Sequence, residues 1–516
     1  MRYYVTTTIP YVNGRPHIGH ALEFVQADAL ARHRRQRGDQ VRLQSGTDDN
    51  ALKNVRAAEH AGVSTAEFVA ANALQFSALQ DALNISVDHF VRTSADPEHA
   101  PSAQRLWGAC HEAGDIYKRA YSGRYCVGCE EFVQDQDLVD GLCLEHQVPP
   151  ELVEEENWFF RLSGFGDRLL DAIENGTLQI IPDTRRREIE AFIRGGLQDF
   201  SISRSVERAR GWGVPVPGDA TQIMYVWFDA LTNYISTLGY ASGADDYSKW
   251  WADGAERVHV VGKGVIRFHA VYWPAILMSA GIAGPDVIYV HEYLTVNGQK
   301  ISKSLGNAAD ATKLCESYGQ DALRYWLLRE PSRTADTDFT EQRLVERHDR
   351  DLANDLGNLV NRTVSMVHRY RDGRVPAPFE QAHGDLEVLA HSLRERVALS
   401  LADFDFRAAL ETVWELVTAA NRLVETSRPW DLFKSERTGD AQARRALDGL
   451  LYTLLEAIAE LAHILQPFLP TTAARMGAAI GLPGTLGWGA VATGAAVGPA
   501  EPLFPRIHVA RQHDRA

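Results

Sequence analysis

The stretch that most constrains the fold is residues 3–23, YYVTTTIPYVNGRPHIGHALE. An apolar, β-favouring run stops at Pro10, a turn-rich segment follows, and His17-Ile18-Gly19-His20 opens a helical pattern. A strand that feeds a helix through a tight turn is where an α/β sheet binds phosphate, because the helix dipole and the first N–H groups favour an anion. The stretch predicts a phosphate site at the carboxyl edge of a parallel sheet. The alternative is a loop with two surface histidines.

A second stretch, residues 297–307 with the sequence NGQKISKSLGN, strengthens this interpretation. It places Lys300 and Lys303 in a small-residue segment, and lysine is a compact cation suited to a triphosphate whose charge moves during reaction. His17 and His20 can donate to phosphate oxygens, while Gly19 lets a nucleotide lie against the backbone. The alternative for the lysine pair is a solvated surface loop. The two stretches together, each beside a strand-like run, favour a nucleotide site.

Composition limits the partners and the compartment. The net charge of −15 argues against wholesale attraction to nucleic acid or membranes, so a nucleic-acid partner needs local basic patches. No apolar run reaches 18 residues, which predicts no membrane span. Met1-Arg2 leads straight into a strand, so no signal peptide is expected. Five cysteines in 516 residues fit a reducing cytoplasm, and the length implies several domains.

The pattern of elements predicts a mixed architecture. Strands alternate with helices in the first part, which indicates a Rossmann-like parallel-sheet α/β domain. Short strand-like pieces then interrupt this rhythm before it resumes, and the last part is helical with a Gly/Ala/Pro-rich tail. The predicted segments are the first half of the α/β domain at 1–115, an insertion at 116–215, the second half at 216–340, an α-helical domain at 341–475 and a C-terminal strap at 476–516.

The insertion carries two closely spaced pairs of potential metal ligands. Cys126 and Cys129 are followed after thirteen residues by Cys143 and His146. Two such pairs separated by a loop suit a tetrahedral Zn²⁺ knuckle. Three thiolates and one imidazole leave no open position, so we expect one structural zinc per chain. The alternative is two unrelated pairs in a loop.

These motifs resemble a known family. HIGH at 17–20 and KISKS at 300–304 resemble the two signatures of class I aminoacyl-tRNA synthetases. The text around them is similar to methionyl-tRNA synthetases over nearly the whole chain, in TTIPYVNGRPHIGHA, MYVWFDALTNY, RFHAVYWPAILMSAGI, YLTVNGQKISKSLGN and DLANDLGNLVNR. The resemblance implies activation of methionine by ATP with Mg²⁺, transfer to tRNA(Met), and a zinc knuckle in the insertion. The chain also resembles those members of the family that lack an appended C-terminal domain, so we expect a monomer.

The resemblance also assigns roles to residues. It implies that the ATP phosphates contact His17, Gly19, His20, Lys300 and Lys303, of which Lys303 is the more critical. It implies that Asp48 holds the methionine ammonium group, with Arg204 nearby. The side-chain sleeve then falls on Ile9, Tyr11, Trp227, Ala230, Leu231, Tyr234, Val265, His269 and Trp273. Without the resemblance the aromatic members are ordinary core. The anticodon would be read by Asn358, Arg362 and Trp430; without the resemblance, Asn358 and Arg362 form an exposed polar face.

Four departures from the family pattern stand near this site. Asn50 and Ala51 replace a histidine and a glycine, and Gly264 replaces a carboxylate expected near the ATP ribose. Glu292 interrupts a His-Gly-aromatic pattern, and Ile301 replaces methionine in the second signature. Three hypotheses follow: an ordinary methionyl-tRNA synthetase, a variant or duplicate copy that resists an inhibitor or charges tRNA for a non-translational pathway, or a tRNA-binding protein that no longer activates an amino acid. The intact signatures favour the first two.

Overall fold

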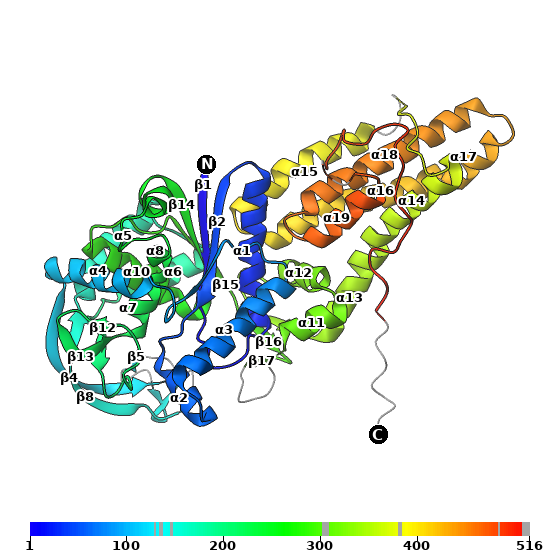
Figure 1. Cartoon of the computed structure of the whole chain (residues 1–516). Coiled ribbons are helices and arrows are strands. Elements are labelled where there is room, and N and C mark those ends of the chain that lie inside the picture. Colours follow the sequence, from blue (N-terminus) through cyan, green and yellow to red (C-terminus); the bar gives the residue numbers. More distant parts are fainter. Residues whose placement is uncertain are drawn as a thin grey trace, which may run out of the picture. The chain divides into compact units, whose positions relative to one another are not determined.

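The computed structural model describes residues 1–127, 131–133, 138–144, 148–301, 309–379, 384–482, 484 and 486–507. The chain forms two compact units (Figure 1). Unit 1 comprises residues 1–81 and 85–293, and unit 2 comprises residues 82–84 and 294–516. No helix in the described part of the chain is both long and apolar enough to cross a membrane.

Unit 1 is built on a six-stranded parallel sheet, as the sequence predicts, with strand order β3-β2-β1-β14-β15-β9. From β1 the chain adds β2 and β3 on one side, and later adds β14 and β15 on the other side. The boundary between β1 and β14 is therefore the switch point at which α/β sheets bind ligands. The strands are β1 (Arg2–Thr7), β2 (Gln40–Thr47), β3 (His89–Arg92), β9 (Gln179–Ile181), β14 (Ala255–Gly262) and β15 (Val287–His291). Val5 in the centre of β1 pairs with Leu43 on one side and Val258 on the other, and all three are buried.

Helices pack around this sheet, and α1 runs beside β1 (Figure 1). They are α1 (Ile18–Gln36), α2 (Leu52–Ala61), α3 (Thr65–Ala82), α4 (His99–Glu112), α5 (Gly166–Glu174), α6 (Asp183–Arg194), α7 (Val226–Leu231), α8 (Asn233–Ser236), α9 (Asp245–Tyr247) and α10 (Trp273–Ser279). After β14 the chain forms a succession of 3₁₀, π and α turns, at Lys263–Val265, Phe268–Tyr272 and Trp273–Ser279.

The range 116–215 forms antiparallel sheets and also reaches the main sheet. Its strands are β4 (Ile116–Cys126), β5 (Glu131–Val133), β6 (Leu138–Val139), β7 (Leu142–Cys143), β8 (Glu151–Phe160), β10 (Phe200–Ser201), β11 (Ser203–Ser205) and β12 (Pro215–Val216), and β13 (Asp219–Met224) follows. The long β4–β8 ladder is antiparallel. Strand β9 of the same range pairs in parallel with β15, so the segment predicted as an insertion also supplies an edge strand of the six-stranded sheet.

Unit 2 is mainly helical, as predicted for the C-terminal part of the chain. A small sheet holds β16 (Leu294–Val296), β17 (Gln299–Lys300) and β18 (Thr337–Phe339). The helical elements are α11 (Ala311–Tyr318), α12 (Gln320–Arg329), α13 (Glu341–Arg347), η6 (His348–Gly357), α14 (Asn358–Arg371), α15 (Gly384–Ala402), α16 (Phe406–Ser427), α17 (Pro429–Glu436), α18 (Ala441–Leu465) and α19 (Pro470–Ala479). Helix α18 contacts the five other helices from α14 onward and is buried along most of its length (Figure 1).

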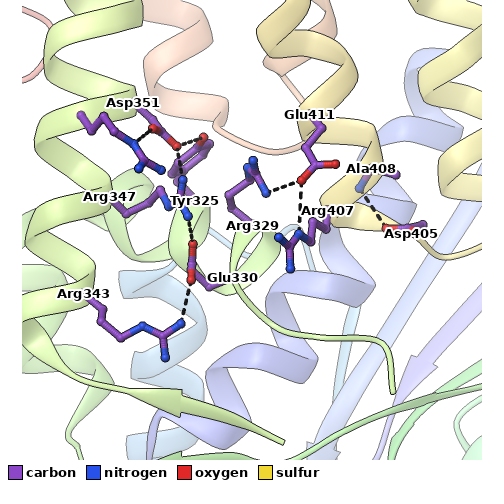
Figure 2. A network of polar contacts seen from close by, with 11 residues as sticks. Tyr325, Arg329, Glu330, Arg343, Arg347, Asp351, Asp405, Arg407, Ala408 and Glu411 are labelled. Atoms are coloured by element: carbon purple, nitrogen blue, oxygen red, sulfur yellow. Dashed lines mark hydrogen bonds and ion pairs between the residues drawn. The ribbon is translucent and has the colours of Figure 1, made fainter. Parts of the chain in front are cut away.

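Ion pairs and hydrogen bonds connect α12, α13 and η6 of unit 2. Figure 2 shows Glu330 accepting from Arg343 at 2.9 Å and from Arg347. Arg347 also donates to Asp351 at 3.0 Å, and Asp351 accepts from the Tyr325 hydroxyl at 2.8 Å. The network therefore joins α12, α13 and η6 through charge-assisted hydrogen bonds, which are stronger than neutral ones.

Candidate active site

The two histidines of the first signature cap the N-terminus of α1. The His17 Nδ1 accepts from the Gly19 N–H at 3.1 Å, and the His20 Nδ1 accepts from the His17 N–H at 3.0 Å. Because each Nδ1 accepts a hydrogen bond from a backbone N–H, the ring proton of each neutral histidine is on Nε2, which makes both rings donors. A side chain at Gly19 would lie 2.9 Å from the His17 ring, so glycine is required here. The arrangement presents ring donors beside a helix N-terminus.

Asp48 lies at the end of the neighbouring strand β2 and is 2% exposed. Its backbone N–H donates to the Pro10 carbonyl at 3.0 Å, and its Oδ1 accepts from the Asn50 N–H at 2.9 Å. Asp48 also forms a β-bridge with Tyr11. The structure therefore brings the predicted ammonium-binding carboxylate next to the loop that connects β1 to α1.

Aromatic side chains from three segments gather beside this loop. Tyr11 meets Trp227 edge to face at 6.3 Å, and Trp227 stacks on Phe268 with ring centroids 3.8 Å apart. The His269 ring lies 6.1 Å from Trp227 and is hydrogen-bonded to Tyr234. Tyr234 in turn lies 6.1 Å from Trp273, while Ala230 and Leu231 are buried on α7 and Ile9 is half-buried after β1. Sequence reasoning missed Phe268, whose only signal is its place directly before His269.

His269 is held as a neutral imidazole. Its Nδ1 lies 2.9 Å from the Val265 carbonyl, which can only accept, so Nδ1 carries the proton and Nε2 accepts from the Tyr234 hydroxyl at 2.8 Å. Burial lowers the pKa of His269 to about 4, and burial raises the pKa of Tyr234 well above its usual value. Neither group is ionised at neutral pH, which leaves an uncharged lining suited to a thioether.

Asn50, the first departure from the family pattern, belongs to a buried polar chain. Its side-chain amide donates to Asp229 Oδ2 at 2.7 Å, and Asp229 Oδ1 lies 2.6 Å from His99 Nε2. On its other side, His99 Nδ1 lies 3.0 Å from the Ser236 hydroxyl. Because its backbone N–H binds Asp48, Asn50 is fixed at both ends. Ala51 is fully buried in a small apolar cluster with Tyr225 and Val226.

The structure also describes the surroundings of the remaining predicted residues. Arg204 is buried between the Tyr125 and Tyr225 rings. Lys300 ends β17 in unit 2, where its backbone pairs with Thr295, whereas its side chain and Lys303 lie outside the described residues. The three predicted anticodon-reading residues are at the surface of unit 2: Asn358 is exposed, Arg362 is half-buried one turn along α14, and Trp430 is 44% exposed at the start of α17.

Two of the four predicted zinc ligands can be placed. Cys126 ends β4 and Cys143 ends β7, and both side chains are buried. The Cys143 N–H donates to the Val148 carbonyl at 2.9 Å. Cys129 and His146 lie outside the described residues. Within the described ranges, no three His, Cys, Asp or Glu side chains cluster as a metal site.

Comparison with known proteins identifies the class. Residues 3–149 and 133–364 match the family described as tRNA synthetases class I (M). The methionine–tRNA ligase of Mycobacterium bovis is 42% identical over 98% of this chain and 98% of its own length. That of Caldanaerobacter subterraneus is 40% identical over 99% of this chain and 80% of its own length. The structure of Mycobacterium tuberculosis methionyl-tRNA synthetase in complex with methionyl-adenylate superposes with a TM-score of 0.92, at 40% identity, over 98% of this chain and 100% of that one.

The fold and these matches define a class I aminoacyl-tRNA synthetase. Within that class, the chain belongs to the methionine–tRNA ligase family. The family expectation drawn from the two signatures and the surrounding sequence is therefore confirmed, and the alternative of a tRNA-binding protein outside the enzymes loses its support.

Proposed function

We propose that the chain activates methionine with ATP at the carboxyl edge of the unit 1 sheet and then transfers it to tRNA(Met). The observation that carries this proposal is the placement of His17 and His20 after β1 and of Asp48 after the adjacent β2. Neighbouring parallel strands end at the same edge, so an anion at α1 and an ammonium group at Asp48 are adjacent. This is the arrangement that joining an amino acid to a phosphate requires.

Two features at this edge of the sheet, a carboxylate and an aromatic sleeve, suit methionine. The Asp48 carboxylate pairs with the ammonium group, while the aromatic sleeve of Trp227, Phe268 and Tyr234 surrounds the side chain. Aromatic rings favour a polarizable thioether. The neutral His269 keeps the sleeve uncharged, so a cationic or anionic side chain would lose its hydration without finding a partner there.

Activation needs positioning rather than a general base, because the methionine carboxylate is already the nucleophile. Its oxygen bonds to the α-phosphorus of ATP, the bond from that phosphorus to the bridging oxygen breaks, and pyrophosphate leaves with the electron pair. His17 and His20 donate to phosphate oxygens, and Lys300 and Lys303 neutralise the charge that builds on the leaving group. Mg²⁺ bound with ATP adds charge neutralisation at the phosphates.

In the second step a hydroxyl of the terminal tRNA ribose attacks the carbonyl carbon of the adenylate, an ester forms and AMP leaves. Asn358 and Arg362 lie four apart on α14 and share one face, which suits hydrogen bonding to unstacked anticodon bases. The exposed ring of Trp430 offers a surface for stacking a base. We further propose that the enzyme works as a monomer in the cytoplasm.

We assign Cys126, Cys129, Cys143 and His146 to one structural zinc ion. Supporting this, the two cysteines that the structure describes are buried beside short antiparallel strands, and thiolates are the soft ligands that structural zinc takes. The zinc would hold this region of unit 1 together and would take no part in the reaction.

The proposal is tested by methionine-dependent ATP–pyrophosphate exchange with Asp48→Asn and the matched surface variant Asp245→Asn. Asp48→Asn removes the charge that pairs with the ammonium group, so kcat/KM for methionine should fall at least a hundredfold. The KM for ATP should change little. Asp245 is exposed on α9, and its variant should match the unmodified protein. Equal methionine kinetics for the two variants would remove Asp48 from the binding site.

The departures favour the second candidate, a variant synthetase. Asn50 is bound to both Asp48 and Asp229, so this chain surrounds the ammonium-binding carboxylate with different side chains from those that the family pattern has. A compound that targets the common pattern would meet different contacts here. Inhibition constants measured for this enzyme and a synthetase with the common pattern test that idea, and equal constants would contradict it.

A further inference from the structure

Tyr293 occupies the space above Gly264 at the carboxyl ends of β14 and β15. A Cβ atom on Gly264 would lie 1.7 Å from the Tyr293 Oη and 3.0 Å from its Cζ. Gly264 does not have a left-handed backbone and is exposed, so neither its φ angle nor packing of the protein core demands glycine. A side chain at position 264 would collide with the Tyr293 hydroxyl, so the two residues form one structural feature, the Gly264–Tyr293 pair.

The ring of Tyr293 is flanked by a buried charge cluster. The Lys263 Nζ lies 4.9 Å from the ring centroid and 3.2 Å from Glu292 Oε2. Glu292 is 4% exposed and receives a bidentate pair of hydrogen bonds from Arg185, with Nε at 2.9 Å. The Glu292 carboxylate, which interrupts the family pattern, is thus neutralised by two cations and does not repel a phosphate nearby.

The Gly264–Tyr293 pair lies at the ends of β14 and β15, on the opposite side of β1 from β2. The nucleoside part of a nucleotide bound at α1 must extend on this side. A nucleotide with its phosphates at the N-terminus of α1 has β2 and Asp48 on one side and β14 and β15 on the other. His291 at the end of β15 lies 3.0 Å from Glu23 of α1, and Glu23 accepts from the Thr8 N–H at 2.6 Å. The end of β15 is therefore tied to the turn between β1 and α1.

We propose that Tyr293 is a nucleotide-recognition residue whose hydroxyl hydrogen-bonds a ribose hydroxyl of ATP. The methionine side, at β2, is occupied by Asp48, so the ribose lies over β14 and β15, where Tyr293 is half-buried with its hydroxyl beside the exposed Gly264. A tyrosine hydroxyl can both donate to and accept from a ribose hydroxyl, whereas a carboxylate can only accept. The Lys263 ammonium lies over the Tyr293 ring and helps to hold it, and Glu292 forms an ion pair with Lys263.

The test, which rests on the proposed activation of methionine, measures exchange with ATP, 2′-deoxyATP and 3′-deoxyATP. Tyr293→Phe should raise the KM for ATP about tenfold, the equivalent of one hydrogen bond, and leave the KM for methionine unchanged. The unmodified enzyme should disfavour one deoxy analogue about tenfold, and Tyr293→Phe should lose that discrimination. The control Tyr247→Phe should behave like the unmodified enzyme. Unaltered discrimination in Tyr293→Phe would overturn the proposal.

A second pair of variants tests the contact itself. Gly264→Ala should displace the Tyr293 hydroxyl and also raise the KM for ATP, whereas adding Tyr293→Phe should not raise it further, since the hydroxyl contact is already lost. A Gly264→Ala enzyme with the original KM would contradict the close approach. If the unmodified protein shows no exchange with methionine, the proposed function fails. Exchange with unchanged ribose discrimination in Tyr293→Phe means that the inference alone fails.

Discussion

Acid should weaken unit 1 through His269, and the size of this effect follows from its surroundings. The imidazole is buried, its Nδ1 proton is bound by the Val265 carbonyl, and its Nε2 accepts from Tyr234. The pKa of Tyr234 is raised well above its usual value, so its hydroxyl keeps its proton. Protonating His269 Nε2 would therefore place an N–H donor against the O–H donor of Tyr234. The folded protein therefore resists taking up a proton at this position.

The sign and the magnitude come from proton linkage. Burial lowers the pKa of His269 from 6.5 to about 4. Between these values the unfolded chain binds a proton that the folded chain does not, so stability falls as pH falls through this window. From pH 7.5 to pH 5.0 the loss attributable to His269 is about 2 kcal/mol.

The assay is urea unfolding followed by tryptophan fluorescence at both pH values. His269→Gln cannot titrate, so its free energy of unfolding should fall about 2 kcal/mol less than that of the unmodified protein between pH 7.5 and pH 5.0. His259, whose pKa burial also lowers, is present in both proteins. His60→Gln, at an exposed position on α2, is the control and should keep the original pH dependence. Identical pH dependence of the unmodified protein and His269→Gln would refute the reasoning.

Three further predictions concern buried groups. Asp229→Asn removes the charged partner of His99 and weakens the amide contact beside the methionine site, so the free energy of unfolding should fall by about 3 kcal/mol and the KM for methionine should rise. Arg185→Met leaves the Glu292 carboxylate paired with a single cation and should lower the midpoint of thermal unfolding by several degrees. Metal analysis of the purified protein should find one zinc per chain, and Cys126→Ser should lower that ratio.

A specific result would contradict each of these three predictions. An Asp229→Asn protein with unchanged stability would mean that the His99 contact contributes nothing. Arg187→Met removes an exposed arginine of the same helix as Arg185, so equal melting shifts in the two variants would contradict a special role for the buried pair. Cys110→Ser serves as the zinc control, since Cys110 lies in the apolar core, and loss of zinc there but not in Cys126→Ser would remove the assignment.

Much of the fold is predictable because local pattern and tertiary position agree. The α1 helix begins at Ile18, directly after the His17 cap, and β1 precedes it in the parallel sheet, as the sequence of residues 3–23 predicts. Strand β9 was not predicted, because three residues carry no periodicity and only pairing with β15 defines them. The π turn at Phe268–Tyr272 is equally hidden in the sequence, because residue spacing alone does not reveal it.

The site was predictable as motifs and not as contacts. His17 and His20 belong to a short segment whose residue types predict phosphate binding, whereas the role of Asp48 is predicted only through the family resemblance. Asn50 stands out in the sequence as a departure, yet its partner Asp229 lies 179 residues further along the chain. The contact between Gly264 and Tyr293 likewise joins residues of two different strand ends. Such partners become neighbours only when the sheet forms, so sequence identifies the positions and the structure supplies their meaning.

The central claim is methionine activation at the carboxyl edge of the unit 1 sheet. Its most direct test is ATP–pyrophosphate exchange measured on the purified full-length chain with each of the twenty amino acids in turn. We predict exchange with methionine alone, because the chain belongs to the methionine–tRNA ligase family and the proposed sleeve around Trp227 is uncharged. Exchange with a different amino acid would contradict the sleeve assignment, and no exchange with any amino acid from folded, zinc-loaded protein would contradict the claim itself.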